Sequence, residues 1–148
     1  MKIKILTATL TSALLLTTPV LAGETMSANE AKAYFVNIED GASVTNPVKV
    51  IFGLSGMGVA PAGTEKKNTG HHHLFIDRAA LGQGSSGNEE LNNGIPSDEN
   101  HKHFGGGQTE TVLNLTPGKH TLQLVMGDLG HVPHNKPVVS EVITISVQ

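Results

Sequence analysis

Histidine is the residue whose number and spacing stand out in this 148-residue chain, which contains eight of them. The segments His71–His73 and His101–His103 each place two histidines at positions i and i+2. On a strand these positions lie on one face about 7 Å apart, and two imidazoles can then meet at one ion at about 2.0–2.1 Å. A third pair, His131 and His134, flanks a proline that stiffens its loop. The pattern predicts a transition-metal site.

The predicted metal ligands are His71, His73, His101, His103, His131 and His134. Imidazole suits zinc, copper, iron and nickel, whereas calcium and magnesium prefer oxygen ligands. Because the chain has no cysteine, its sulfur ligands are limited to thioethers, of which Met57 and Met126 are the candidates. This donor set favours copper(II) or zinc over copper(I). The carboxylates of Asp77 and Asp128 are expected to complete a site or to orient a ring.

Two other interpretations of the histidines stay open. In one, a metal with an open coordination position performs redox or hydrolytic chemistry, and Glu110 or Asp128 assists proton transfer. In the other, no metal binds, and the histidines form a hydrogen-bonded network that shapes an interaction surface. We expect His72 to point to the opposite face from its two neighbours, and His120 to be structural.

The N-terminus predicts export. Lys2 and Lys4 precede an apolar run over residues 5–20, and small residues follow around Ala22, which is the pattern of a cleaved signal peptide. We therefore expect a signal peptide over residues 1–22, a flexible N-terminal segment over residues 23–32 and one domain over residues 33–148. This division predicts a periplasmic or secreted protein. No later segment is long and apolar enough to span a membrane.

Charge and composition narrow the possible partners. The formal net charge is −3, and loss of the two lysines of the signal peptide takes it to −5. A mildly acidic chain without a clustered basic surface argues against nucleic-acid binding. With no cysteine, no disulfide can stabilise the exported fold, and with no tryptophan the core must consist mainly of Val, Leu and Ile.

Short alternating apolar runs, separated by Gly and Pro, predict strands and no helix. These runs cover residues 33–38, 48–54, 71–77, 110–115, 120–126 and 138–147. Pro117-Gly118 predicts a tight turn that joins the fourth and fifth runs in a hairpin. Residues 79–108 predict a long surface excursion. The expected fold is all-β, a single antiparallel immunoglobulin-like β-sandwich with long histidine-bearing loops, with a small barrel as the alternative.

Four segments together resemble a known family. They are GMGVAPAGTEKKNTGHHHLFID, HFGGGQTETVLNL, PGKHTLQLVMGD and HVPHNKPV, and they are similar to the bacterial domain of unknown function 4399. The resemblance implies an exported bacterial domain and supplies no activity. A weaker likeness links LTPGKHTLQLVMGD to copper/zinc superoxide dismutases, which are β-sandwiches with histidine-bound metal. Gln123 stands where that family places its second strand histidine.

The expected function follows from these features. We expect a periplasmic or secreted protein that binds copper(II) or zinc in metal buffering, transport or sensing, rather than an enzyme. Its expected partners are the metal ion and, secondarily, another periplasmic protein. The pattern is compatible with one metal site or two, and with any oligomeric state.

Overall fold

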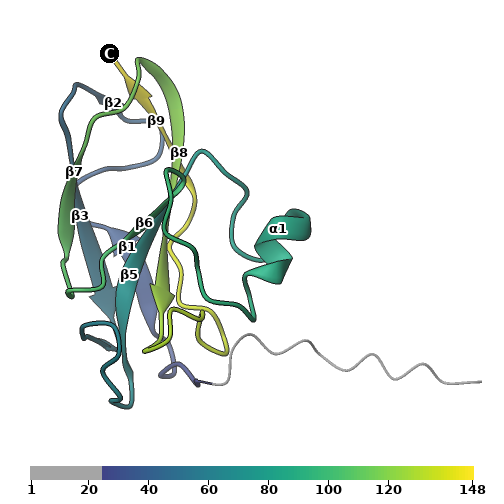
Figure 1. Ribbon diagram of the computed structural model, residues 1–148. Helices are drawn as coiled ribbons and strands as arrows, with labels where there is room; N and C mark the ends of the chain where they lie inside the picture. The colour runs from purple at the N-terminus through teal and green to yellow at the C-terminus, as the bar shows by residue number, and fades with distance from the viewer. Residues whose placement is uncertain (1–24) are drawn as a thin grey trace, which may run out of the picture.

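The computed structural model describes residues 25–148, so the predicted signal peptide over residues 1–22 and the start of the N-terminal segment lie outside the described residues. Strands make up most of the regular structure (Figure 1). The elements are β1 (Lys32–Phe35), β2 (Ser43–Val44), β3 (Val48–Ser55), β4 (Gly58–Val59), β5 (Thr69–Ile76), α1 (Gly84–Glu89), β6 (His101–His103), β7 (Glu110–Leu113), β8 (Gly118–Gly127) and β9 (Ile143–Val147).

The strands form two sheets. The smaller sheet has the order β1-β3-β7, and the larger has the order β2-β9-β8-β5-β4, with β6 also paired to β5. Most neighbouring strands are antiparallel, whereas the short β2 and β4 pair in parallel with β9 and β5. Strand β5 joins several strands of the larger sheet, because it pairs with β4, β6 and β8.

The core lies between the two sheets and is built by residue alternation. In β3, Val48, Val50 and Phe52 are buried, whereas Lys49 between them is exposed. The facing sheet contributes the fully buried Leu74, Leu122, Leu124 and Met126. Burial of each such side chain stabilises the fold by about 1.5–3 kcal/mol. The predicted all-β sandwich with antiparallel sheets is confirmed, and its immunoglobulin-like connectivity stays a prediction.

The predicted hairpin around Pro117-Gly118 is wrong. Strand β7 pairs with β3 in the smaller sheet, whereas β8 pairs with β5 and β9 in the larger one. The connection between them is held by Asn46, whose side-chain Oδ1 accepts a hydrogen bond from the Leu115 N–H at 3.1 Å. Pro and Gly break a strand equally well at a tight turn and at a crossing between sheets, so the local residues predict the break but not the pairing.

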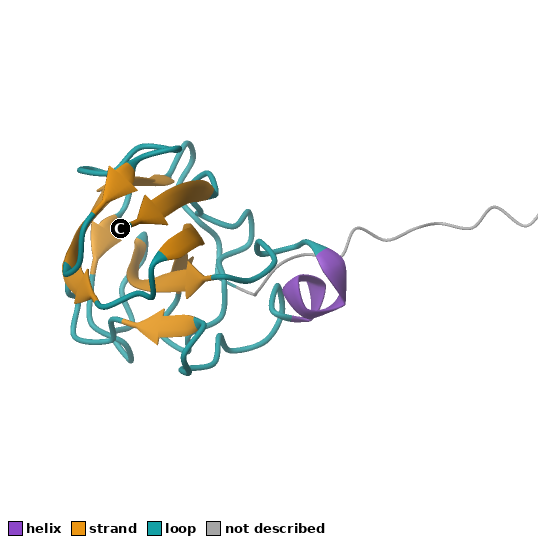
Figure 2. Ribbon diagram, turned by 90° about the horizontal axis from the view of Figure 1, so that it is seen from above, coloured by secondary structure: helices purple, strands orange, loops and turns teal. Residues whose placement is uncertain are grey.

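The predicted surface excursion contains two elements that the sequence did not indicate. Helix α1, six residues long, lies at the periphery of the molecule, beyond the loops beside the sheets (Figure 2). Strand β6 ends the excursion and carries both His101 and His103. Within residues 25–148 no helix has the length and apolar character needed to cross a bilayer.

A second, smaller core covers the outer face of the larger sheet. Phe75 of β5 and Val125 of β8 pack there against Ile95 of the excursion. Gln123 of β8 forms hydrogen bonds with two segments that cover this face. Its Oε1 accepts from the Leu81 N–H at 3.0 Å, and its Nε2 donates to the Ser140 carbonyl at 3.3 Å. Strand β5 is therefore buried on both faces.

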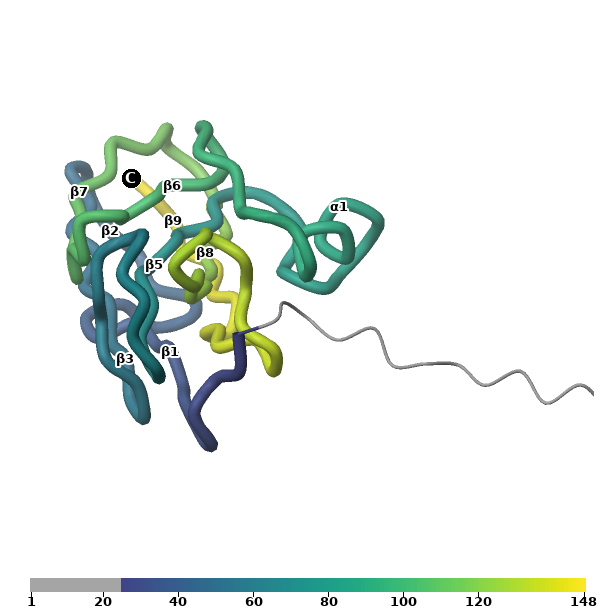
Figure 3. The backbone as a smooth tube through the Cα atoms, turned by 60° about the horizontal axis from the view of Figure 1, so that its bottom comes forward, coloured from purple at the N-terminus to yellow at the C-terminus, as the bar shows by residue number. Residues whose placement is uncertain are grey.

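The N-terminal segment, which we expected to be flexible up to residue 32, is hydrogen-bonded where the structure describes it. The Ser27 N–H donates to the Asn135 carbonyl at 3.2 Å, and the Asn135 N–H donates to the Thr25 carbonyl at 2.8 Å. This places the start of the described chain against the loop that follows β8 (Figure 3).

Both ring nitrogens of His120 form hydrogen bonds with neighbouring residues. Nδ1 lies 2.6 Å from Oδ2 of Asp77, and Nε2 lies 2.8 Å from the Thr116 carbonyl oxygen. The hydrogen bond to Asp77 raises the pKa of His120 above its usual value of 6.5. Asp77 also accepts from the Thr121 N–H through Oδ1 at 2.9 Å, which fixes the carboxylate. His120 is thus a structural residue.

We predict that the His120→Asn variant loses more stability at low pH than at high pH. Because the folded-state pKa is raised, the stabilisation by His120 is fully present below about pH 6.5 and is lost as pH rises through the folded-state pKa. Urea unfolding at pH 5.5 and pH 9 should show a loss of about 1 kcal/mol at the lower pH and a smaller loss at the higher. An equal loss at both pH values would contradict the prediction.

Candidate metal centre

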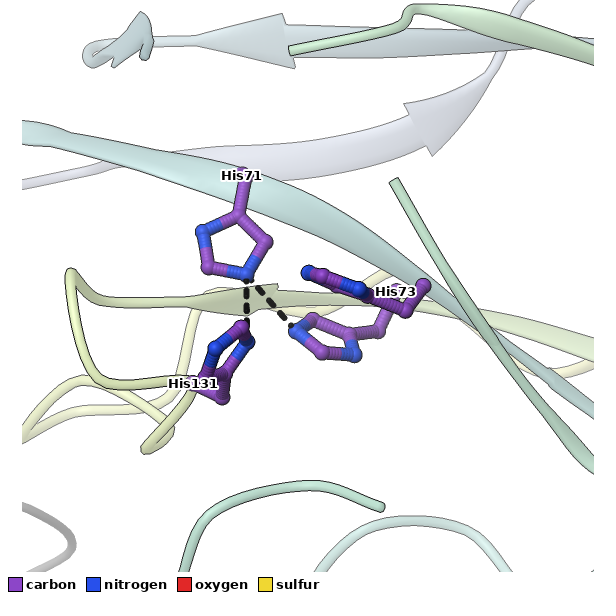
Figure 4. A group of neighbouring side chains, drawn as sticks. His71, His73 and His131 are labelled. Carbon is purple, nitrogen blue, oxygen red and sulfur yellow. Dashed lines mark hydrogen bonds between the residues drawn. The ribbon is translucent and has the colours of Figure 1, made fainter. Parts of the chain in front are cut away.

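Four of the six predicted ligands lie together on the outer face of the larger sheet. They are His71, His73, His103 and His131. Each offers one ring nitrogen, and these four nitrogens all lie within 4.8 Å of one another. His71 and His73 project from β5, and His131 belongs to the loop after β8 (Figure 4). His103 ends β6. This cluster of four histidines is the group among residues 25–148 that could hold a metal ion.

The pairing of the strands explains how the rings meet. His71 and His73 occupy positions i and i+2 of β5, so both point to the same face. The register places His73 opposite His103 of β6, which brings the third ring alongside. On the other side of β5, His71 is opposite Gly127, after which the chain turns into the loop that carries His131. One strand therefore provides two ligands, and its two neighbours deliver the others.

Two nitrogen–nitrogen distances within the cluster match those of ligands around a small cation. Nε2 of His71 lies 3.0 Å from Nε2 of His73 and 3.1 Å from Nδ1 of His131 (Figure 4). Metal–nitrogen bonds of about 2.0–2.1 Å place ligand nitrogens about 3.3 Å apart in a tetrahedral site and about 2.9 Å apart in a square-planar one. The observed separations fall between these two geometries.

Hydrogen bonding alone does not satisfy the cluster. One imidazole nitrogen carries either one N–H or one lone pair, yet Nε2 of His71 has two close nitrogen neighbours. In addition, Nδ1 of His71, Nδ1 of His73 and Nε2 of His103 are buried without a hydrogen-bond partner among the described residues. A buried polar group without a partner costs about 1–3 kcal/mol. A cation bound between the converging nitrogens would accept their lone pairs together, although Nδ1 of His71 and Nδ1 of His73 are the other nitrogens of their rings and would not contact it.

The surroundings favour the neutral form of three of these rings, which is the form that binds a metal. Burial, followed by the neighbouring His131 and His103, lowers the pKa of His71 from 6.5 to about 4. Burial and the charges of the other clustered rings lower the pKa of His73 to about 2. The pKa of His103 is also lowered, first by burial and then by His131. At neutral pH little proton competition for these nitrogens is expected.

Glycines make room for the rings. A Cβ atom on Gly127 would lie 2.8 Å from Nε2 of His73, and a Cβ atom on Gly105 would lie 2.3 Å from Cε1 of His103. Both distances are shorter than carbon atoms tolerate, so any side chain at these positions would displace a clustered ring. The backbone thus comes close to the cluster on two sides.

Asp128 organises the loop that carries His131. Its Oδ1 accepts from the N–H groups of Gly130 at 2.8 Å and Val132 at 3.0 Å. Its Oδ2 accepts from the Thr25 hydroxyl at 2.7 Å. His131 adopts a φ of +70°, in the left-handed region that costs a non-glycine residue about 1 kcal/mol or more. These hydrogen bonds hold the strained turn, and Asp128 acts on the cluster through the loop rather than as a ligand.

The model of a protein family, described as a domain of unknown function (DUF4399), matches residues 50–148 of this chain. The chain belongs to the DUF4399 family. The resemblance seen in the sequence is thereby confirmed, and the matched region contains all four clustered histidines. No curated protein and no solved structure matches the chain.

The other two predicted ligands of this DUF4399 chain lie outside the cluster. His101 shares the face of His103, but its Nδ1 lies 2.7 Å from Oδ1 of Asp98 and its Nε2 lies 3.2 Å from Oε1 of Glu90. His134 is fully buried, with its ring nitrogens 3.4 Å from the Met126 carbonyl oxygen and 3.2 Å from that of Thr69. Both rings are thus engaged by oxygen atoms of the protein.

The remaining candidates of the DUF4399 chain also lie elsewhere. His72 points into the core between the sheets, as expected, and its ring lies 5.2 Å from that of Phe52. Met126 belongs to the same core, and Met57 packs against it. Asp77 is occupied by His120, and Glu110 forms an exposed ion pair of 3.1 Å with Lys49. Sequence reasoning missed Gly105 and Gly127, the two glycines beside the rings, because their closeness to the rings depends on contacts between segments far apart in the chain.

We predict that Gly127→Ala destabilises the DUF4399 domain and displaces the His73 ring. The new methyl group has no space beside Nε2 of His73, and overpacking of this kind costs about 1–3 kcal/mol. Gly130→Ala is the matched control, because its Cβ would make an ordinary contact of 3.6 Å with Asp128 in the same loop. Urea unfolding and the NMR signals of the histidine rings test both variants. Equal behaviour of the two would count against the packing described here.

Proposed function

We propose that this DUF4399 protein is an exported, periplasmic or secreted, metal-binding protein that holds one copper(II) or zinc ion on His71, His73, His103 and His131. Its role is to buffer, carry or sense that ion. The observation that carries the proposal is the convergence of the four ring nitrogens, which all lie within 4.8 Å of one another.

The donor set supports the choice of ion. All four donors of the cluster are imidazole nitrogens, which suit copper(II) and zinc and are poor ligands for calcium or magnesium. The two thioethers that a copper(I) site could use lie in or against the core between the sheets. The lowered pKa values of His71, His73 and His103 also favour binding, since the ion displaces few protons from these rings.

The positions of the carboxylates support binding over catalysis. An open metal site that performs acid–base chemistry needs a proton-transfer group close to the metal. The two carboxylates suggested for that task are engaged elsewhere: Asp128 accepts from Gly130, Val132 and Thr25, and Glu110 pairs with Lys49 in the smaller sheet. The geometry therefore favours a site that holds and releases an ion.

We predict that the mature protein binds one equivalent of zinc or copper(II) and that His73→Ala weakens this binding by more than about 100-fold. Loss of a residue that only supports a ligand costs about 10–100-fold in affinity, and loss of a ligand costs more. The measurement is a titration of stripped protein against a competing chelator, together with elemental analysis of the protein isolated from the cell.

His72→Leu is the matched control for this experiment. It removes a histidine of the same strand that points into the core between the sheets, and should leave metal affinity unchanged. His120→Asn is a second control that lies outside the cluster. Equal weakening by all three substitutions, or stoichiometric binding that survives in His73→Ala, would contradict the assignment. Wild-type protein with no affinity for either ion would instead support a hydrogen-bonded interaction surface.

A further inference from the structure

The segment over residues 77–100, which joins β5 to β6 and is named the outer loop, is connected to both of the clustered histidines that lie outside β5. We propose that the outer loop is a metal-coupled lid, and that Glu90 is the positioning residue that links it to His103. Docking of the outer loop and binding of the ion then strengthen each other. This inference rests on the proposed function, because it concerns regulation of the same site.

The first connection runs through a buried ionic network. Nη1 of Arg78 donates to Oε1 of Glu90 at 2.5 Å, and Nε2 of His101 lies 3.2 Å from the same oxygen and in contact with Arg78. Asp98 engages the other ring nitrogen of His101. The side chains of Arg78, Glu90 and His101 are only 10%, 13% and 8% exposed. Glu90, which follows α1 directly, therefore fixes the outer loop to β6.

Strand β6 connects the ionic network around Glu90 to the cluster of four histidines. It is three residues long and its strand partner is β5, with His101 opposite Phe75 and His103 opposite His73. The His101 ring packs edge-on against Phe75 with centroids 4.9 Å apart. His101 and His103 lie on one face at the two ends of so short a strand, so the position of one largely determines the position of the other.

The second connection is a direct hydrogen bond to the backbone of His131. The Ile95 N–H of the outer loop donates to the carbonyl oxygen of His131 at 3.0 Å. The Ile95 side chain is buried in the small core with Phe75 and Val125. Docking of the outer loop thus adds to the hydrogen bonds accepted by Asp128, which hold His131 in its strained conformation.

The two connections make the coupling reciprocal. Two of the four ligands are held in place when the outer loop is docked, and a docked loop reduces the entropy lost on binding an ion. By linkage, a bound ion must stabilise the docked loop by the same factor by which docking raises affinity. The exposed surface of α1 would then differ between the metal-free and metal-bound states, which gives a partner protein a means of distinguishing them.

Hydrogen exchange of the wild-type mature protein, metal-free and loaded with zinc, tests the coupling without any substitution. We expect zinc to slow exchange of amides across residues 77–100, including α1, while residues 48–55 of the smaller sheet change little. Slowing that is confined to the segments around residues 69–73, 101–105 and 127–134 would overturn the inference.

A matched pair of variants tests the role of Glu90. Glu90→Gln removes the charge that binds Arg78 and His101, whereas Glu89→Gln changes an exposed neighbour in the same helical turn. We expect Glu90→Gln to weaken zinc binding about tenfold and to lose the zinc-induced protection of the outer loop, and Glu89→Gln to do neither. If Glu90 were merely structural, the metal-free variant would melt earlier but bind zinc with wild-type affinity.

The outcomes separate the two proposals. Wild-type protein that binds zinc, with Glu90→Gln unchanged in both affinity and loop protection, would overturn the lid and leave the metal site standing. Wild-type protein without affinity for either zinc or copper(II) would overturn the proposed function and the lid together.

Discussion

Strand β5 is buried on both faces, and this burial determines where its histidines lie. Alternation along this strand sends His72 and Leu74 into the core between the sheets, and His71 and His73 to the opposite face. That face is itself covered by loops, so the two rings cannot use solvent to satisfy their nitrogens. The segments that cover them supply more imidazoles, and the result is a buried cluster rather than a solvated pair.

Such a cluster has a cost that a metal ion can offset. The lowered pKa values of His71 and His73 mean that the unfolded chain takes up protons below about pH 6.5 that the folded chain does not. The metal-free fold therefore loses stability as pH falls. An ion that binds the folded chain adds stability by mass action. Without an ion the cluster lowers the stability of the fold, as is common at functional sites.

The sequence predicted the longer strands and the shared face of His71 and His73, because both depend on local alternation. Metal binding by these histidines stays a prediction. The sequence could not predict which histidines meet. His71 and His101 each belong to a His-x-His pair, yet register places His103 opposite His73 and leaves His101 opposite Phe75, beside Glu90. The pairing of β7 was missed for the same reason, since turn residues do not encode a partner strand. Long-range register, rather than residue type, selects the site.

The cluster is asymmetric in a way that suits exchange of an ion. His71 and His73 are fully buried on a strand paired along both edges, whereas His103 and His131 are partly exposed and lie where short segments leave the sheet. A rigid pair of ligands lowers the entropy lost on binding. A pair of ligands on movable segments can dissociate from the ion first without disturbing the sheet. Release through the loop-borne pair needs only local opening, which costs far less than global unfolding. Affinity can then be set by β5, and the rate of exchange by the loops that cover it.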